Sequence, residues 1–133
     1  DGMPKAASIR GGAETLTFRG RWEKDKAIPV GLATVLINGE IAIATVPGEP
    51  FLVMQERWKR EAGVAVPLFY GYTQSTGDPW PGYIPDIRSA AYGGYGADNA
   101  TTIEPGAAER IMDHHLITLY GLRGMWLKEP GRP

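Results

Sequence analysis

The strongest constraint on the fold is a pair of apolar segments around Asn38 and Gly39. The segments read VGLATVLI at residues 30–37 and EIAIATV at residues 40–46. Asn-Gly accepts positive φ at both central positions of a tight turn, as a type I′ hairpin requires. Both faces of the segments are apolar or small, a pattern typical of strands that are covered on both sides. We therefore expect a buried β-hairpin inside a sheet, with covering layers on both faces.

Further strands and two amphipathic helices are expected around this hairpin. Alternating residues predict a half-buried strand at 14–22, and an aromatic-rich run predicts another at 64–72. Helical spacing of apolar residues predicts a helix at 51–61, with Pro50 as its first residue, and a second helix at 105–123. The predicted fold class is α/β, with α+β as the alternative.

The chain ends suggest a piece of a larger unit. Residues 1–13 and 128–133 lack periodicity, so we expect loose ends there. The length of 133 residues suits one domain, but the first residue is Asp and suggests a processed or excised chain. A hairpin that is apolar on both faces also needs neighbours. We therefore expect residues 1–133 to be a single partial domain, a fragment of a larger layered α/β domain.

Composition excludes several functional classes. Lys and Arg total 14 against 15 Asp and Glu, so the chain has no electrostatic footprint for nucleic acid. The absence of cysteine excludes disulfides, thiolate catalysis and cysteine-based metal sites. No apolar run approaches the ~18 residues that a bilayer span needs. We expect no nucleic-acid partner and no transmembrane segment.

Glu49 is the first candidate functional residue. It lies in the Pro47–Pro50 junction between a buried strand and a helix, where layered α/β folds usually bind ligands. The alternative is a carboxylate that caps the helix N-terminus and interacts with its dipole.

An aromatic segment is the second candidate. Residues 73–99 are predicted to be a long loop, and long loops in compact domains are usually functional or disordered. Tyrosine has an apolar body and a polar tip, which suits a pocket wall or an interface; the alternative is that the rings only anchor the loop. The six aromatic residues from 70 to 95 are Tyr70, Tyr72, Trp80, Tyr83, Tyr92 and Tyr95.

His114 and His115 are not expected to bind a metal together. Adjacent helical side chains point about 100° apart and cannot share one ion. We predict that His115 is packed in the core and that His114 is exposed.

The order of motifs resembles that of a known family. Along the chain stand INGEIAIATVPGEPF, an amphipathic helix, FYGYTQ, PGYIPD and IEPGAAERIMDHHLITLYGL. Over about residues 30–123, this succession resembles the C-terminal part of the catalytic domain of neutral, non-lysosomal ceramidases. These enzymes are zinc-dependent amidases that cleave the N-acyl bond of ceramide.

The resemblance implies roles for three residues. Glu49 matches a glutamate zinc ligand of the family, and Tyr83 matches a tyrosine that binds zinc as a phenolate. Tyr95 matches a tyrosine that lines the active site, so it is expected to contact substrate. The resemblance implies no catalytic residue in this chain. It also implies that two histidines from the preceding part of the domain complete the zinc site, which is therefore incomplete here.

The function implied is that of a sphingolipid hydrolase acting on ceramide or another N-acyl lipid. Its partner is the remainder of the catalytic domain, its location is secreted or periplasmic, and the isolated chain is expected to be inactive. A different class stays open, namely a non-catalytic binding or structural module. Such a module retains the scaffold and uses the aromatic segment to meet a lipid, sugar or protein partner.

Overall fold

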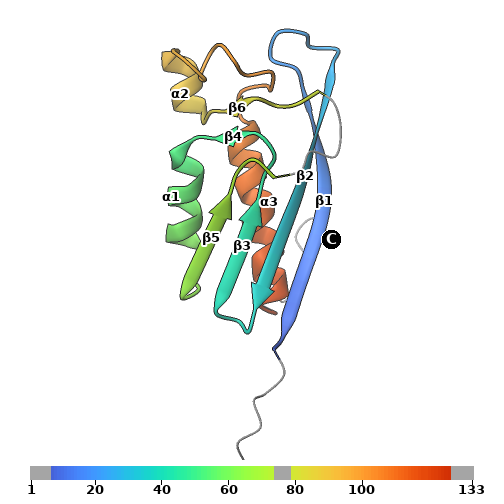
Figure 1. The fold of residues 1–133 in the computed structure, drawn as a ribbon, viewed down its shortest axis with the longest axis vertical. Coiled ribbons are helices and arrows are strands. Elements are labelled where there is room, and N and C mark those ends of the chain that lie inside the picture. Colours follow the sequence, from blue (N-terminus) through green and yellow to red (C-terminus); the bar gives the residue numbers. More distant parts are fainter. Residues whose placement is uncertain (1–6, 74–78, 127–133) are drawn as a thin grey trace, which may run out of the picture.

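A computed structural model describes residues 7–73 and 79–126 (Figure 1). The described elements combine a mixed sheet with helices, which confirms the predicted α/β or α+β class. In chain order they are β1 (Ile9–Arg19), β2 (Ala27–Ile37), β3 (Ile41–Thr45), β4 (Glu49–Pro50), α1 (Leu52–Glu61), β5 (Val66–Tyr70), β6 (Tyr83–Ile84), α2 (Ile87–Tyr92) and α3 (Ala107–Leu122).

The predicted hairpin forms the centre of the main sheet. The strand order is β1-β2-β3-β5, with β1, β2 and β3 antiparallel and β5 parallel to β3. Asn38 and Gly39 have φ of 52° and 70°, and the Glu40 amide donates to the Ile37 carbonyl at 3.0 Å. The predicted turn is therefore confirmed. Helix α1 makes the crossover that two parallel strands require.

The core lies on one face of this sheet. Even-numbered residues of β2 and β3 point toward the helical side of the sheet; in Figure 1, α3 lies behind the strands and α1 lies beside β5. The fully buried side chains there include Ile28, Val30, Met54, Trp58, Ile111, Met112 and Leu119.

The opposite face of the sheet is not covered by a described helix, whereas the sequence predicted covering layers on both faces. Odd-numbered residues of β2 and β3 are half-buried or exposed, because no described helix packs on that face. The two-sided apolar pattern therefore does not mark two covered faces within the described residues.

Two predicted boundaries are wrong. Residues 9–13 were expected to be loose, yet they belong to β1, which pairs with β2 along its whole length from Ile9↔Ile37 to Arg19↔Ala27. Gly11 and Gly12 carry no side chain, so the alternation that would reveal a strand is missing there. Pro50 lies in β4 rather than in the first turn of α1, which begins after Phe51. Residues 1–6 and 128–133 of the predicted loose ends lie outside the described residues.

The predicted loop at 73–99 contains two short elements, β6 and α2. In α2 the Asp86 side chain accepts a hydrogen bond from the Ser89 amide at 3.4 Å, and Glu109 of α3 accepts one from the Ile87 amide at 2.8 Å. A helix of six residues is too short to show a helical period in the sequence. Residues 74–78 of this segment lie outside the described residues.

A membrane span is not found among the described helices, none of which combines sufficient length with sufficient apolarity.

Candidate functional site

A short parallel ladder places Glu49 beside Tyr83. Strands β4 and β6 pair as Glu49↔Tyr83 and Pro50↔Ile84, and the Glu49 amide donates to the Gly82 carbonyl at 2.9 Å. In Figure 1 the ladder lies beyond the ends of β3 and β5. These are the carboxyl ends of two parallel strands, which the sequence predicted as the ligand-binding edge.

Two glycines allow this close approach. Gly48 and Gly82 have φ of 91° and 66°, in the left-handed region. A Cβ on Gly48 would lie 2.7 Å from the Gly82 carbonyl oxygen, and one on Gly82 would lie 2.5 Å from that of Ala100. A side chain at either position would therefore force β4 and β6 apart or displace residues 100–101.

Tyr72 holds the Glu49 carboxylate from the end of β5. Its amide donates to the Gly48 carbonyl at 2.8 Å, and its hydroxyl donates to Glu49 Oε2 at 2.8 Å. Tyr72 has φ of 56°, which is rare for a residue with a side chain. The sequence marked Tyr72 only as one of six aromatic residues; its contact with Glu49 depends on tertiary pairing that no local pattern encodes.

The Tyr83 phenol is protonated at neutral pH in this chain. A hydrogen bond to Glu49, then desolvation and the negative charge of Glu49, raise the Tyr83 pKa from 10.0 to about 12. A phenolate at this position needs a nearby cation, because positive charge favours the ionised form.

Tyr95 completes an aromatic group around Tyr83. The rings of Tyr83 and Tyr95 meet edge to face with centroids 5.4 Å apart, and Phe51 meets Tyr83 at 6.2 Å. A cavity of about 530 Å³ lies next to this group, lined by Phe51, Arg88, Ser89, Tyr92, Gly93, Gly94, Tyr95 and Ala97. The structure therefore brings Glu49, Tyr83 and Tyr95 together, although they lie far apart in the sequence.

Glu49 does not cap α1. The N-cap of that helix is Phe51, and no side chain makes a capping hydrogen bond there. The alternative interpretation of Glu49 as a helix cap is therefore wrong, and its carboxylate accepts from Tyr72 instead.

The side chains present supply part of a metal shell. Glu49 offers a carboxylate, and Tyr83 and Tyr72 offer phenol oxygens. Across residues 7–73 and 79–126, no three His, Cys, Asp or Glu side chains gather where they could hold an ion. Because catalytic zinc usually has three protein ligands, this chain alone fits zinc only incompletely.

The two histidines do not supply the missing ligands. His115 is fully buried, as predicted, with Nδ1 2.8 Å from Thr34 Oγ1 and Nε2 3.1 Å from the Thr45 carbonyl oxygen. His114 was predicted to be exposed, but its side chain is only 18% exposed and lies 3.6 Å from Glu14. His114 is partly buried because α3 packs against β1 at this point. The sequence did not predict which strand lies beside this part of the helix.

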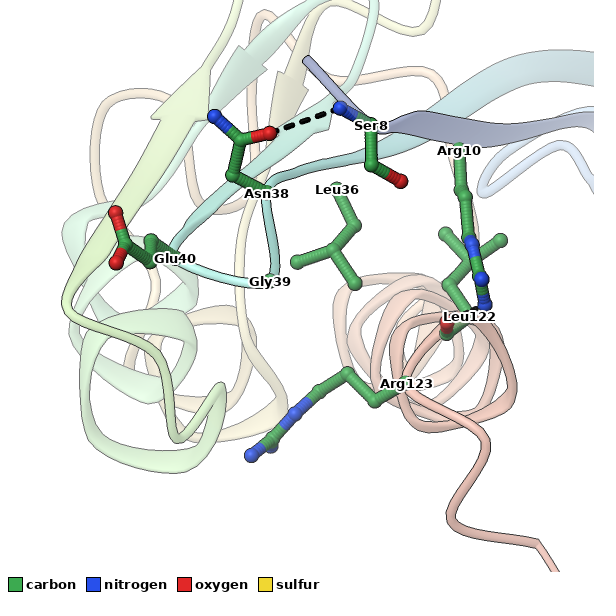
Figure 2. Close-up of a pocket in the computed structure, with 8 residues that line it drawn as sticks. All are labelled: Ser8, Arg10, Leu36, Asn38, Gly39, Glu40, Leu122 and Arg123. Atoms are coloured by element: carbon green, nitrogen blue, oxygen red, sulfur yellow. Dashed lines mark hydrogen bonds between the residues drawn. The ribbon is translucent and has the colours of Figure 1, made fainter. Parts of the chain in front are cut away.

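A second cavity lies at the opposite end of the sheet (Figure 2). It measures about 850 Å³ and is lined by Ser8, Arg10, Leu36, Asn38, Gly39, Glu40, Leu122 and Arg123. Arg10 donates to the Leu122 carbonyl at 3.3 Å, and Arg123 donates to the Ala62 carbonyl at 3.0 Å. Both guanidinium groups thus satisfy carbonyls at the ends of α3 and α1. Their arrangement is explained by helix termination.

Comparison with known proteins adds no relative. No protein-family description, curated protein or solved structure matches this chain. The geometry around Glu49 and the order of sequence motifs are therefore the grounds on which a function is proposed.

Proposed function

We propose that this chain is the C-terminal portion of a zinc-dependent amide hydrolase similar to the neutral ceramidases, and that it contributes Glu49 and Tyr83 as zinc ligands. The observation that carries the proposal is the pairing of these two residues in the β4–β6 ladder. A carboxylate and a phenol on facing residues can approach one ion from neighbouring strands. Both belong to motifs that resemble those of the family.

The surrounding residues suit this role. Tyr72 orients the Glu49 carboxylate through its hydroxyl, and Phe51 and Tyr95 pack against the Tyr83 ring. When bound, zinc supplies polarisation of a carbonyl oxygen and a more acidic water. Two histidines from the remainder of the catalytic domain complete the ligand set in this proposal, so the isolated chain is inactive.

The proposed substrate is ceramide or another N-acyl lipid. The cavity beside Tyr95 is lined by Phe51, Tyr92 and Tyr95, whose rings suit an apolar chain. Its position next to the Glu49–Tyr83 pair would bring an acyl chain close to the metal.

The test measures zinc in the longest polypeptide that the encoding reading frame specifies. We expect one zinc per polypeptide, lost in the double variant Glu49→Gln and Tyr83→Phe. A matched control combines Glu56→Gln on α1 with Tyr70→Phe on β5, which makes the same chemical changes at exposed positions outside the candidate site. Equal zinc in the wild type and the Glu49–Tyr83 variant would contradict the ligand assignment. Zinc binding without hydrolysis of any N-acyl amide in a panel would contradict the substrate class.

A binding module is the second candidate. It is favoured by the exposure of the aromatic rings, since Tyr72, Tyr92 and Tyr95 are each at least 70% exposed. A module of this kind predicts that Tyr92→Ala and Tyr95→Ala abolish binding to ceramide-containing vesicles, while Glu49→Gln leaves that binding unchanged. The hydrolase proposal predicts that all three reduce turnover.

A further inference from the structure

The cavity beside Tyr95 combines an aromatic wall with one positive charge. Its lining includes the rings of Phe51, Tyr92 and Tyr95, and its volume of about 530 Å³ lies within the range of about 300–1,000 Å³ that is usual for small-molecule sites. Among the described residues of this lining, Arg88 alone is charged. The cavity therefore suits a ligand that has an apolar part and a negative charge.

Arg88 has no acidic partner among the described residues. It forms no ion pair with them, whereas Arg57 contacts Glu61 and Asp113 at 2.7 and 2.6 Å. The Arg88 guanidinium lies over the Tyr92 ring, 5.7 Å from its centroid, so the charge lies at the aromatic wall. A guanidinium in this position can donate two parallel hydrogen bonds to a carboxylate.

The wall that carries Arg88 is held by hydrogen bonds within the chain. The Arg21 guanidinium donates to the carbonyls of Ala90, in α2, and of Ala97, in the cavity lining. The Ala97 amide in turn donates to the Gly94 carbonyl at 3.0 Å. Because the wall is already ordered, a ligand loses less free energy in ordering it.

The cavity adjoins the candidate metal site. Phe51 and Tyr95 line the cavity, and their rings also pack against Tyr83 with centroid distances of 6.2 and 5.4 Å. Figure 1 shows α2, which carries Arg88, at the same end of the molecule as the β4–β6 ladder. A chain that begins beside Tyr83 can therefore pass these two rings and extend toward Arg88.

We propose that this cavity binds an apolar chain that ends in a carboxylate, with Arg88 as the charge partner of that carboxylate. The chain lies against the three rings, and the guanidinium donates to the carboxylate oxygens. The inference rests on the proposed hydrolase only for the source of the ligand, which is one half of the amide substrate. It favours an acidic N-acyl lipid over ceramide, because ceramide is neutral and leaves Arg88 without a partner.

Titration of the metal-free chain with decanoate, followed by intrinsic fluorescence, tests the proposal. We expect decanoate to bind more tightly than decanol, because only the carboxylate can pair with Arg88. Arg88→Gln should weaken decanoate binding about fivefold, the upper value for an ion pair that stays in contact with water, and leave decanol binding unchanged. Arg88→Glu should reverse the preference, so that decylammonium binds more tightly than decanoate. The matched control is Arg60→Gln, the same change at an exposed position of α1.

Circular dichroism checks that the variants fold, and Arg88→Lys, which keeps the charge, should retain the preference for decanoate. Three results would overturn the proposal. They are a wild type that binds decanoate no more tightly than decanol, equal effects of Arg88→Gln and Arg60→Gln, and an unchanged preference in Arg88→Glu.

Turnover by the longest polypeptide of the reading frame shows which half of the substrate carries the carboxylate. An N-acyl aminohexanoate is charged on its amine half, and a monoamide of decanedioic acid is charged on its acyl half; the methyl ester of each is the neutral match. Water cleaves each amide to an acid and an amine. We expect Arg88→Gln to raise KM about fivefold for one of the two charged amides and for neither ester.

This comparison also separates the inference from the hydrolase proposal. Turnover that Arg88→Gln does not change for either charged amide would overturn the inference and leave the hydrolase proposal intact. Decanoate binding that depends on Arg88, without turnover of any amide, would overturn the hydrolase proposal and support the cavity as a carboxylate site.

Discussion

At the scale of single residues, Glu49 controls the protonation of Tyr83. Its hydrogen bond and its charge, together with desolvation, raise the Tyr83 pKa to about 12. The Tyr83 pKa therefore depends on whether a carboxylate is present at position 49. We expect Glu49→Gln to lower the Tyr83 pKa toward 10, because the amide carries no charge. Ultraviolet titration of tyrosinate, with Tyr83→Phe to assign the signal, measures this shift. Glu56→Gln is the control, and an unchanged Tyr83 pKa in Glu49→Gln would disprove the coupling.

His115 makes the stability of the fold depend on pH. Burial, followed by the charge of His114, lowers the His115 pKa from 6.5 to about 4, although a hydrogen bond to the Thr45 carbonyl opposes this shift. The unfolded chain therefore binds a proton between pH 6.5 and pH 4 that the folded chain does not. The contribution of His115 to the free energy of unfolding is therefore fully present above pH 6.5. It falls by about 3 kcal/mol as the pH drops to 4.

Urea unfolding of the wild type and of His115→Leu isolates this contribution. We expect the variant to lose less stability between pH 7 and pH 4 than the wild type does. Carboxylates titrate equally in both proteins, so the difference belongs to His115. Identical pH dependence in the two proteins would contradict the assignment.

At the scale of elements, the β4–β6 ladder depends on glycine more strictly than the central hairpin does. Gly82 and Gly39 both have positive φ, but a Cβ on Gly39 meets no atom within 4 Å, whereas one on Gly82 meets the Ala100 carbonyl oxygen at 2.5 Å. We expect Gly39→Ala to cost about 1 kcal/mol of unfolding free energy through backbone strain alone. Gly82→Ala adds the steric clash and should cost about 3 kcal/mol or more.

Thermal unfolding of the two alanine variants makes this comparison directly. The prediction also separates stability from the site, because Gly82→Ala should return the Tyr83 pKa toward 10 while Gly39→Ala leaves it unchanged. Equal destabilisation by the two substitutions would show that β4 and β6 are not in close contact.

Sequence patterns predict the long elements better than the short ones. The hairpin, α1 and α3 extend over enough residues for their apolar periods to be read, and the Asn-Gly turn fixes one register. β6 and α2 have two and six residues and depend on tertiary partners such as Glu109, which no local pattern reveals. The grouping of Glu49, Tyr83 and Tyr95 was accessible only through the order of motifs. The Tyr72–Glu49 hydrogen bond was not accessible at all.

At the scale of the whole molecule, Arg21 ties residues 79–106 to the main sheet. Its guanidinium donates to the carbonyls of Ala90 and Ala97, and its amide donates to the Thr102 carbonyl at 2.8 Å. We expect Arg21→Ala to speed amide hydrogen exchange across residues 87–97 at least tenfold and to leave β2 and β3 unchanged. Arg88→Ala, on the exposed side of α2, is the control. Uniform acceleration throughout the chain would contradict a local role for Arg21.

The separate β4–β6 ladder also bears on the order of events in folding. Glu49 follows β3 closely in the chain, but its partner Tyr83 comes after α1 and β5 in the sequence, and Gly82 forms a bridge with Thr101. We expect the acid–phenol pair to assemble late in folding, because it joins two short strands that are far apart in the sequence. In refolding experiments, we expect the high-pKa tyrosine to appear after the four-stranded sheet has formed, and a partly folded chain to lack the contact between Glu49 and Tyr83.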